Sequence, residues 1–437
     1  MKLTRANLEV ATGQDFSPAP VRIVHMGLGA FHRAHQAWYT DEVDVNREWG
    51  IAAFTGRTAT EAEKLNQQDG LFTLITRGDT DKFEVIQSIV EAHDGNDTQA
   101  FTDLVAKPST AIVTLTITEA GYGFDKSGKV DPANLAPAMA RLAKALIARR
   151  THGSAPIAVV SCDNIPANGE LLGRAMRAVF IELGDEMLAW LNANVSFVST
   201  SIDRITPKIT DADLAIVASA TGFEDASPVV TEPFSDWVLS GDFPAGRPAW
   251  EKAGAKFVEN IHDFENRKLW LLNGSHSLLA YAGQLRGHQT VAQAIADEAC
   301  LGWVQDFWTE AVNNLPIVGL DLDVYRANLL ARFSNGNIAH RLGQIAIDGS
   351  TKLSVRVAPI ALAELAKGNR AQGCALAIAA WVKFVSNNEF TDSRKAEVEE
   401  ASAASGDRVQ NLVSVINEEL AANSSFMEDV KRALQLF

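Results

Sequence analysis

The chain has 437 residues, a length typical of two or three domains. With 47% hydrophobic and 21% charged residues it has the composition of an ordinary globular protein, which excludes disordered, collagen-like and coiled-coil chains. The 54 acidic residues outnumber the 39 basic ones, and the net charge of −15 argues against nucleic acid as a partner, because phosphate backbones are repelled.

The cysteines and the apolar segments restrict the location of the protein. Cys162, Cys300 and Cys374 lie far apart, so neither a disulfide framework nor a structural zinc site is predicted. The N-terminal segment lacks the apolar stretch of a secretory signal. The longest apolar run is roughly ten residues, about half of what a membrane-spanning helix needs. We therefore expect a cytoplasmic protein without a membrane partner.

The first 260 residues alternate between strand and helix patterns. Short apolar runs predict strands at 21–29, 50–56, 110–118, 155–164, 196–205 and 255–260. Helical spacing of apolar residues predicts helices at 134–150 and 169–184. This alternation is typical of parallel βαβ units in a doubly wound sheet.

Beyond about residue 265 helix patterns dominate. The predicted helices are 266–283, 290–313, 322–333, 357–384, 393–402, 407–422 and 426–436. The sequence therefore predicts an α/β fold with a Rossmann-type doubly wound domain over 1–260. A mostly α-helical domain over 261–437 is expected to follow it.

A glycine-rich turn follows the first predicted strand. Its residues are Gly27-Leu28-Gly29-Ala30-Phe31-His32, so only the first two glycines of GxGxxG are present. A dinucleotide site needs glycine here because the turn is tight and the backbone must approach a pyrophosphate closely. An ordinary strand–helix turn is the alternative, since a lone GxG is a weak signal.

The second strand ends without the acid that usually binds the ribose of NAD. Phe54 is followed by Thr55, Gly56, Arg57 and Thr58, and the next acid is Glu61. Arg57 can stack on adenine or meet a 2′-phosphate. The choice between NAD and NADP is therefore open at this stage.

The densest group of reactive side chains lies between residues 268 and 276. On an α-helix at about 100° per residue, His276 lies about 80° and Asn273 about 140° from Lys268, so all three can share one side. A desolvated lysine can act as a general base, asparagine can stabilise an oxyanion and histidine can position a hydroxyl. Spacing alone favours the alternative, a surface lysine, an Asn-Gly helix break and a core histidine.

Polar residues also follow two predicted strands. Asn164 follows the fourth strand and Asp203 lies near the end of the fifth. Ligands of open α/β sheets bind beyond the carboxyl ends of strands, which makes both residues site candidates. Helix caps and turn formers are the alternative.

Two other patterns point to different chemistry. Tyr122 and Lys126 have the spacing of the short-chain dehydrogenase pair, but the glycine-rich segment around them does not predict a helix. His32 and His35 can suggest a metal site, yet no further ligand accompanies them, and none is predicted. Contact of His32 with cofactor or substrate is the favoured interpretation.

Several motifs in order resemble the mannitol dehydrogenase family of long-chain polyol and hexuronate dehydrogenases. The resemblance begins with GLGAFHRAHQ at 27–36 and covers about residues 21 to 360. The further motifs are TEAGY at 118–122, SCDNIPANG at 161–169, DRITP at 203–207, EPFSDW at 232–237, KLWLLNGSH at 268–276 and DGSTK at 348–352.

The resemblance implies a role for each candidate residue. Lys268 is the acid/base at the reacting C–O, and Asn164 and Asn273 form the oxyanion hole. His276 holds a neighbouring hydroxyl, Asp203 assists proton transfer, and Glu265 lies near the proton exit path. Cofactor contacts are implied for Gly27, Leu28, Gly29, Ala30, Phe31, Arg57 and Thr118. The family works without metal, and its cofactor is NAD, with NADP left open here.

The substrate side departs from the family pattern. DGSTKLSVR stands at 348–356, where many relatives have DGSQKLPQR. The basic residues Arg341, Lys352 and Arg356 favour a keto-uronate such as D-fructuronate, reduced to D-mannonate, with His32 as a further substrate contact. A polyol dehydrogenase acting on mannitol or arabinitol is the alternative, and a non-catalytic NAD(H) sensor a second one. A small sugar is the expected partner, and the chain is expected to be a monomer or a homodimer.

Overall fold

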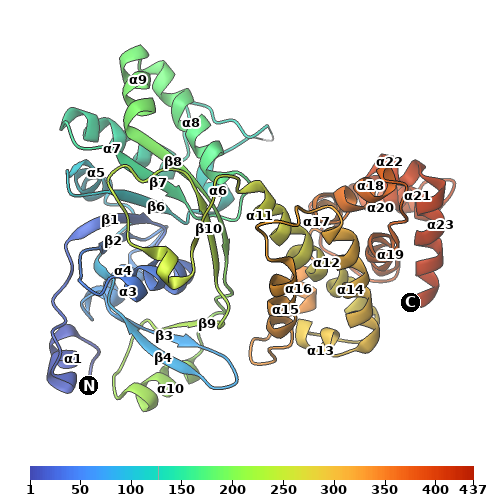
Figure 1. Ribbon diagram of the computed structural model, residues 1–437, viewed down its shortest axis with the longest axis horizontal. Helices are drawn as coiled ribbons and strands as arrows, with labels where there is room; N and C mark the ends of the chain where they lie inside the picture. Colours follow the sequence, from blue (N-terminus) through green and yellow to red (C-terminus); the bar gives the residue numbers. More distant parts are fainter. Residues whose placement is uncertain (126) are drawn as a thin grey trace. The chain divides into compact units, whose positions relative to one another are not determined.

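The computed structural model describes residues 1–125 and 127–437, which form two compact units, 1–262 and 263–437 (Figure 1). Lys126 of the Tyr122–Lys126 pattern lies outside the described residues. Tyr122 itself ends a short helix, and Gly123 follows it in the left-handed conformation. The two units are described separately below.

The first unit contains an eight-stranded sheet. Its order is β5-β2-β1-β6-β7-β8-β10-β11, and the first six strands of that order are parallel. Numbered along the chain, these six have the order 3-2-1-4-5-6, which is the Rossmann arrangement. The strands are β1 (Val21–Met26), β2 (Gly50–Phe54), β5 (Ile89–His93), β6 (Ile112–Leu115), β7 (Ile157–Ser161), β8 (Val195–Asp203), β10 (Asp236–Ser240) and β11 (Lys256–Phe257). The predicted fold of this unit is confirmed.

Alternate residues of the strands point into two separate cores. Ile23 and Ile51 belong to the core on one face, while Val24 and Phe54 belong to the core on the other. Strands buried on both faces need helices on both faces, as parallel sheets require. Figure 1 shows α5, α7, α8 and α9 along one side of the sheet. The helices of this unit are α1 (Arg5–Thr12), α2 (Ala30–His32), η1 (Arg33–Ala37), α3 (Trp38–Val43), α4 (Thr60–Asn66), α5 (Thr98–Ala106), α6 (Thr118–Tyr122), α7 (Pro137–Thr151), α8 (Asn168–Glu182), α9 (Asp185–Asn194), α10 (Asp211–Thr221) and η2 (Trp250–Ala253).

The structure adds five strands that the sequence patterns did not predict. Two of them, β5 and β10, belong to the large sheet, and the other three form a second sheet. The second sheet has the order β4-β3-β9, with β4 (Lys82–Ile86), β3 (Phe72–Thr76) and β9 (Val229–Thr231). These strands are only three to five residues long, too short for alternation to stand out from loops.

All named elements of the second unit are helical, which confirms the predicted helical character. Two of its helices, α12 and α19, are buried along most of their length. The elements are α11 (His262–Arg267), η3 (Lys268–Gly274), α12 (Ser275–Leu285), α13 (Val291–Ile295), α14 (Glu298–Val312), α15 (Leu322–Phe333), α16 (Leu342–Ile345), α17 (Gly349–Arg356), α18 (Ala358–Ala366), α19 (Gln372–Asn387), α20 (Lys395–Ala403), α21 (Arg408–Ile416), α22 (Glu418–Ala422), α23 (Ser424–Ala433) and η4 (Leu434–Leu436).

Three predicted helices are divided in the structure, and one of them, 407–422, forms α21 and α22, because Asn417 accepts the N–H of Leu420 and starts the second helix. The segment 290–313 forms α13 and α14, because Asp297 accepts the N–H groups of Ala299 and Cys300 and starts a new helix there. The segment 357–384 forms α18 and α19, separated by a turn with Gly368 at φ 77°. Among the described residues, no helix is long and apolar enough to cross a membrane.

Candidate active site

The glycine turn lies where the strand order of the large sheet reverses, between β1 and β6. Gly27 has φ 113°, and a Cβ atom there would come within 2.0 Å of the Thr116 carbonyl oxygen. The Thr116 hydroxyl donates a hydrogen bond to the Gly27 carbonyl at 2.8 Å. The turn is therefore closed against β6, and only glycine fits at its first position.

Nothing within the chain itself requires a glycine at position 29. It has extended backbone angles, and a Cβ atom there would meet only the Gly27 oxygen, at 3.7 Å. The space in front of Gly29 is therefore open to a ligand, at the point where the strand order reverses. A pyrophosphate fits this cradle, because the backbone can approach it without an intervening side chain.

The other residues of the turn support it from inside the unit. The N–H of Leu28 donates to the Phe54 carbonyl at 2.7 Å, and Ala30 begins α2. The ring of Phe31 stacks on His35 at a centroid distance of 5.0 Å. These contacts fix the position of the turn, and direct cofactor contacts of these residues stay a prediction.

His32, at the third glycine position of the motif, is fully buried. Its ring stacks on His25, with centroids 3.3 Å apart and the two planes within 8° of parallel. The rings of His25 and His32 thus pack beneath the turn. Contact of His32 with substrate stays a prediction, and what the structure shows is packing within this unit.

The stacked histidines make the stability of the protein depend on pH. Burial lowers the pKa of His25 to about 3, against an ordinary value of 6.5. Below pH 6.5 His25 binds a proton in the unfolded chain but not in the folded protein. The free energy of unfolding therefore decreases as the pH is lowered. For this residue we expect a loss of about 2 kcal/mol in the free energy of unfolding between pH 7.5 and pH 5.

Urea unfolding of the wild type and of His25→Asn across this pH range tests the prediction. The variant keeps a polar side chain beside Thr114 and Thr116, which hydrogen-bond both ring nitrogens of His25. Between pH 7.5 and pH 5 the free energy of unfolding of the variant is expected to decrease by about 2 kcal/mol less than that of the wild type. Parallel profiles of the two proteins would show that His25 is protonated in the folded state.

Asp163 joins the ends of β6 and β7. Its carboxylate accepts the N–H of Thr118 at 2.8 Å and the hydroxyl of Tyr122 at 2.8 Å. Thr118 has φ 63°, a strained conformation for a β-branched residue and typical of functional positions. Burial raises the pKa of Asp163. Sequence analysis missed Asp163 as the residue that holds Thr118 in place.

Asn164 follows Asp163 and is exposed beyond the carboxyl end of β7. The loop that carries it is fastened by Asn168, whose amide donates to the backbone oxygens of Asp163 and Thr200, both at 2.8 Å. Asp203 is buried at the end of β8, where it pairs in register with Asp236 of β10. The fold thus places Thr118, Asn164 and Asp203 at the carboxyl ends of β6, β7 and β8, three neighbouring parallel strands.

Lys268 and Asn273 lie on a π-helix, η3, which joins α11 to α12. The predicted α-helix over 266–283 is therefore wrong for residues 268–274, which form a π-helix. The angles calculated at 100° per residue do not apply between Lys268, Asn273 and His276. The wider turn of a π-helix is rare and is often found at functional sites. Lys268, Asn273 and Glu265 are all half-buried, with Glu265 on α11 three residues before the lysine.

His276 is buried in the first turn of α12. Its ring contacts the rings of His340 and Phe333, at centroid distances of 4.8 and 5.0 Å. Burial holds the pKa of His276 well below its ordinary value, and the nearby His340, Arg332, Arg356 and Lys352 lower it further. A neutral imidazole results, which can hold a hydroxyl group. Sequence analysis missed His340 and Arg332, because each lies more than 50 residues away along the chain.

Arg356, at the end of α17, reaches the π-helix. Its Nη1 donates to the Asn273 carbonyl at 3.2 Å and to the Ser277 hydroxyl at 3.1 Å. Lys352, one turn earlier, donates to the Ile345 carbonyl at 3.0 Å. Burial lowers the pKa of both side chains, that of Arg356 to about 10. Arg341 is exposed at the start of α16.

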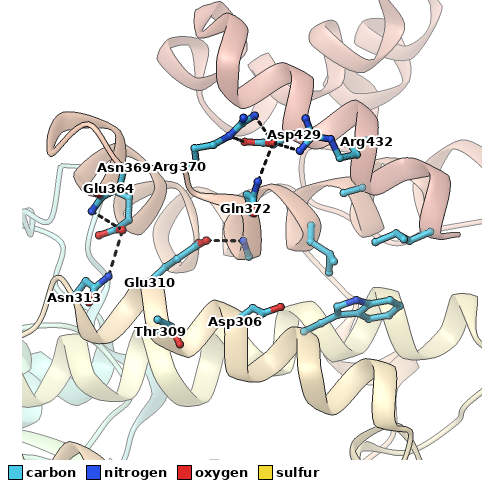
Figure 2. Close-up of a pocket in the computed structure, with 15 residues that line it drawn as sticks. Asp306, Thr309, Glu310, Asn313, Glu364, Asn369, Arg370, Gln372, Asp429 and Arg432 are labelled. Atoms are coloured by element: carbon cyan, nitrogen blue, oxygen red, sulfur yellow. Dashed lines mark hydrogen bonds and ion pairs between the residues drawn. The ribbon is translucent and has the colours of Figure 1, made fainter.

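A cavity of about 670 Å³ lies elsewhere in the second unit, between α14, α19 and α23 (Figure 2). Two of its acidic residues, Glu310 and Asp429, are engaged in structural contacts. Glu310 accepts the N–H groups of Gly373 and Cys374 at the start of α19, and Asp429 accepts from Arg370. Among the described residues, its lining includes none of the predicted site residues.

His288, Asp297 and Cys300 bring their ligand atoms within 4.8 Å of one another. The contacts of Asp297 account for this proximity. Its carboxylate accepts from Arg286 at 2.7 Å and from His288 at 2.9 Å, and it caps α14. Burial raises the pKa of Cys300 to about 11, so the thiol stays protonated at neutral pH.

A Rossmann sheet with an open glycine cradle, followed by a helical unit that carries lysine and asparagine on a π-helix and histidine at the start of the next helix, defines a nicotinamide-dependent dehydrogenase. The sequence matches the mannitol dehydrogenase Rossmann domain over residues 21–252 and the mannitol dehydrogenase C-terminal domain over 260–437. The chain belongs to the mannitol dehydrogenase family, as its motifs predicted.

Individual relatives act on sugar acids and on polyols. D-Mannonate oxidoreductase of Escherichia coli (strain K12) is 34% identical, over 98% of this chain and 96% of the relative. D-Arabinitol 4-dehydrogenase of Ralstonia nicotianae is 36% identical, over 82% of this chain and 81% of the relative. Among solved structures, the ternary complex of Pseudomonas fluorescens mannitol 2-dehydrogenase with NAD and D-mannitol is similar to this chain, with a TM-score of 0.81. The two sequences are 32% identical, and the match covers 100% of this chain and 96% of the relative.

Proposed function

We propose that the chain is an NAD(P)-dependent oxidoreductase that interconverts a keto-uronate and its alcohol, with D-fructuronate and D-mannonate as the favoured pair. The dinucleotide, when bound, exchanges a hydride with the substrate carbon. Family membership and the open cradle at Gly29 support the reaction class. The D-mannonate oxidoreductase relative, matched over nearly its whole length, supports the substrate.

The proposed roles follow the chemistry of each side chain. In the direction of reduction, Lys268 gives a proton to the carbonyl oxygen, and the amides of Asn164 and Asn273 donate to that oxygen as negative charge develops. His276, kept neutral by burial, holds a neighbouring hydroxyl. Asp203 and Glu265 are assigned to proton transfer between Lys268 and solvent. No step requires a metal ion.

The observation that carries the choice of an acidic sugar is the state of Arg356. It is partly buried, and among the described residues its guanidinium pairs with no carboxylate and uses only Nη1 for hydrogen bonds. A desolvated cation without a counter-ion is costly, and a substrate carboxylate bound bidentately would compensate it. A neutral polyol would leave this charge unpaired.

Substitution of Arg356 tests whether this residue binds the carboxylate of the substrate. We expect Arg356→Ala to raise KM for fructuronate by about tenfold or more, because a charged hydrogen-bond pair is lost. Arg356→Lys, which keeps the charge but not the planar fork, is expected to rescue part of the loss. Arg341→Ala, at an exposed site, is the matched control and should change KM less than about twofold. Equal effects of the two alanine variants would refute the carboxylate role.

Substrate assays test whether the protein acts on a keto-uronate or on a neutral sugar. Fructuronate and fructose are offered to the purified protein with NADH and with NADPH, and nicotinamide absorbance is followed. Turnover of fructuronate alone supports the proposal. Turnover of fructose alone would make the chain a polyol dehydrogenase, the candidate favoured by the mannitol-bound relative. Tight NADH binding without turnover of any uronate or polyol would identify a sensor. Sedimentation would test the expected monomer or homodimer.

A further inference from the structure

The loop after β2 presents a cation where NAD-specific sheets present an acid. Phe54 ends β2, and Gly56, Arg57 and Thr58 beyond it are exposed. In Rossmann folds, an acid near this strand end binds the ribose 2′-hydroxyl of NAD, and an arginine nearby accommodates the 2′-phosphate of NADP. The adenosine end of a bound dinucleotide would therefore face a guanidinium and a hydroxyl.

Arg57 makes no polar contact with the residues that the structure describes. Among the described residues its guanidinium makes no hydrogen bond or ion pair, and its side chain is exposed. Arg33, only 24 positions earlier, shows the contrast. It is buried and bonds both the backbone and the hydroxyl of Ser227. Arg57 is therefore available to an anion that comes from solution.

The acid that follows on the chain is engaged elsewhere. One oxygen of Glu61 accepts from Arg33 at 3.0 Å and from the Ser227 hydroxyl at 2.6 Å, and the other accepts from Lys64 at 3.0 Å. Burial raises the pKa of Glu61, but the hydrogen bonds from Ser227 and Lys64 outweigh it and hold the pKa below its ordinary value. Glu61 thus stays ionised and anchored to Arg33 and Lys64, and among the described residues it forms no ion pair with Arg57.

The acid that follows the neighbouring strand is held in its own turn. Asp94 follows β5 and caps its own turn by accepting the N–H of Asn96 at 2.9 Å. Thr55, buried at the strand end, accepts the N–H of Gly95 at 2.8 Å. The loops of β2 and β5 are thereby tied together, and the exposed groups at the tip of β2 are those of Arg57 and Thr58.

We infer that Arg57 and Thr58 form a subsite for a ribose 2′-phosphate, so that the protein uses NADP(H) at least as efficiently as NAD(H). The inference rests on the proposed function, because it requires a dinucleotide on the Gly27 turn. Arginine and phosphate pair through two parallel N–H···O bonds, and the Thr58 hydroxyl adds a donor. No free carboxylate on this loop would repel the phosphate.

Calorimetric binding of two nucleotide fragments tests the subsite without turnover. Adenosine 2′,5′-bisphosphate and AMP differ only in the 2′-phosphate. We expect the bisphosphate to bind the wild-type protein about tenfold more tightly or better, and Arg57→Ala to abolish the difference. Arg174→Ala, which removes an exposed arginine of α8, is the matched control and should leave the difference intact. Equal affinities of the wild type for both fragments would overturn the inference.

Steady-state kinetics with NADPH and NADH complete the test. The wild type is expected to reach a kcat/KM with NADPH equal to or above that with NADH, and Arg57→Asp to reverse the order in favour of NADH. Efficient use of NADH with rejection of NADPH would overturn the 2′-phosphate subsite and leave the proposed function standing. Absence of binding of either dinucleotide would overturn the proposed function together with the subsite.

Discussion

Replacement of Lys268 by alanine is expected to lower kcat by a factor on the order of a thousand and to leave the affinity for NADH within about twofold. General acid/base catalysis by a positioned side chain contributes in this range. Dinucleotide affinity should change little, because the pyrophosphate is proposed to bind at the glycine turn after β1, whereas Lys268, at the first position of the π-helix, is proposed to act on the substrate oxygen.

Single-turnover kinetics and NADH fluorescence titration separate the two effects. Lys268→Arg keeps the positive charge, but a guanidinium releases its proton far less readily than an ammonium group, so this variant should also be inactive. Lys256→Ala, a surface lysine of β11 paired with Asp236, serves as the control and should retain activity. Most of the turnover surviving in Lys268→Ala would show that another group carries the proton.

Alanine at the two glycines of the turn is expected to give opposite phenotypes. In Gly27→Ala the new Cβ would lie 2.0 Å from the Thr116 oxygen at a backbone φ of 113°, so the turn must move. We expect a loss of about 3 kcal/mol or more in the free energy of unfolding, from strain and overpacking together. Dinucleotide binding should be lost as well.

Gly29→Ala should fold normally, because its Cβ has no close neighbour and its backbone angles suit any residue. It should nevertheless weaken NADH binding by about tenfold or more, since the methyl group occupies the space that the pyrophosphate needs. Thermal unfolding measures the first effect and fluorescence titration the second. Unimpaired binding in Gly29→Ala would show that the cradle is not the pyrophosphate site.

The sequence was a good guide to the fold class, because long apolar runs identify buried parallel strands. The six predicted strands and the helical second half are present in the structure. The five strands that escaped prediction are short, and β10 is paired antiparallel to β8, where Asp236 faces Asp203, 33 residues earlier in the chain. Helix borders failed where one side chain, such as the carboxylate of Asp297, starts a new helix inside a continuous apolar pattern.

The candidate site, like the fold, was predicted from the sequence only in part. The residue types and the order of the motifs are properties of the sequence, and they sufficed to indicate dehydrogenase chemistry and the family. Spacing misjudged the segment 268–274, because a π-helix is rare and its wider turn breaks the α-helical period that the spacing assumed.

By itself, the sequence determined the chemical groups that this protein can use: the glycine turn, the lysine, the amides and the basic residues near the end of the motif series. Only the tertiary structure decided which of them are available. It buries His32 against His25, engages Glu61 with Arg33, and brings Arg356 to the carbonyl of Asn273, 83 residues away. The physical reason is that burial and ion pairing depend on contacts between distant segments, which local spacing does not encode.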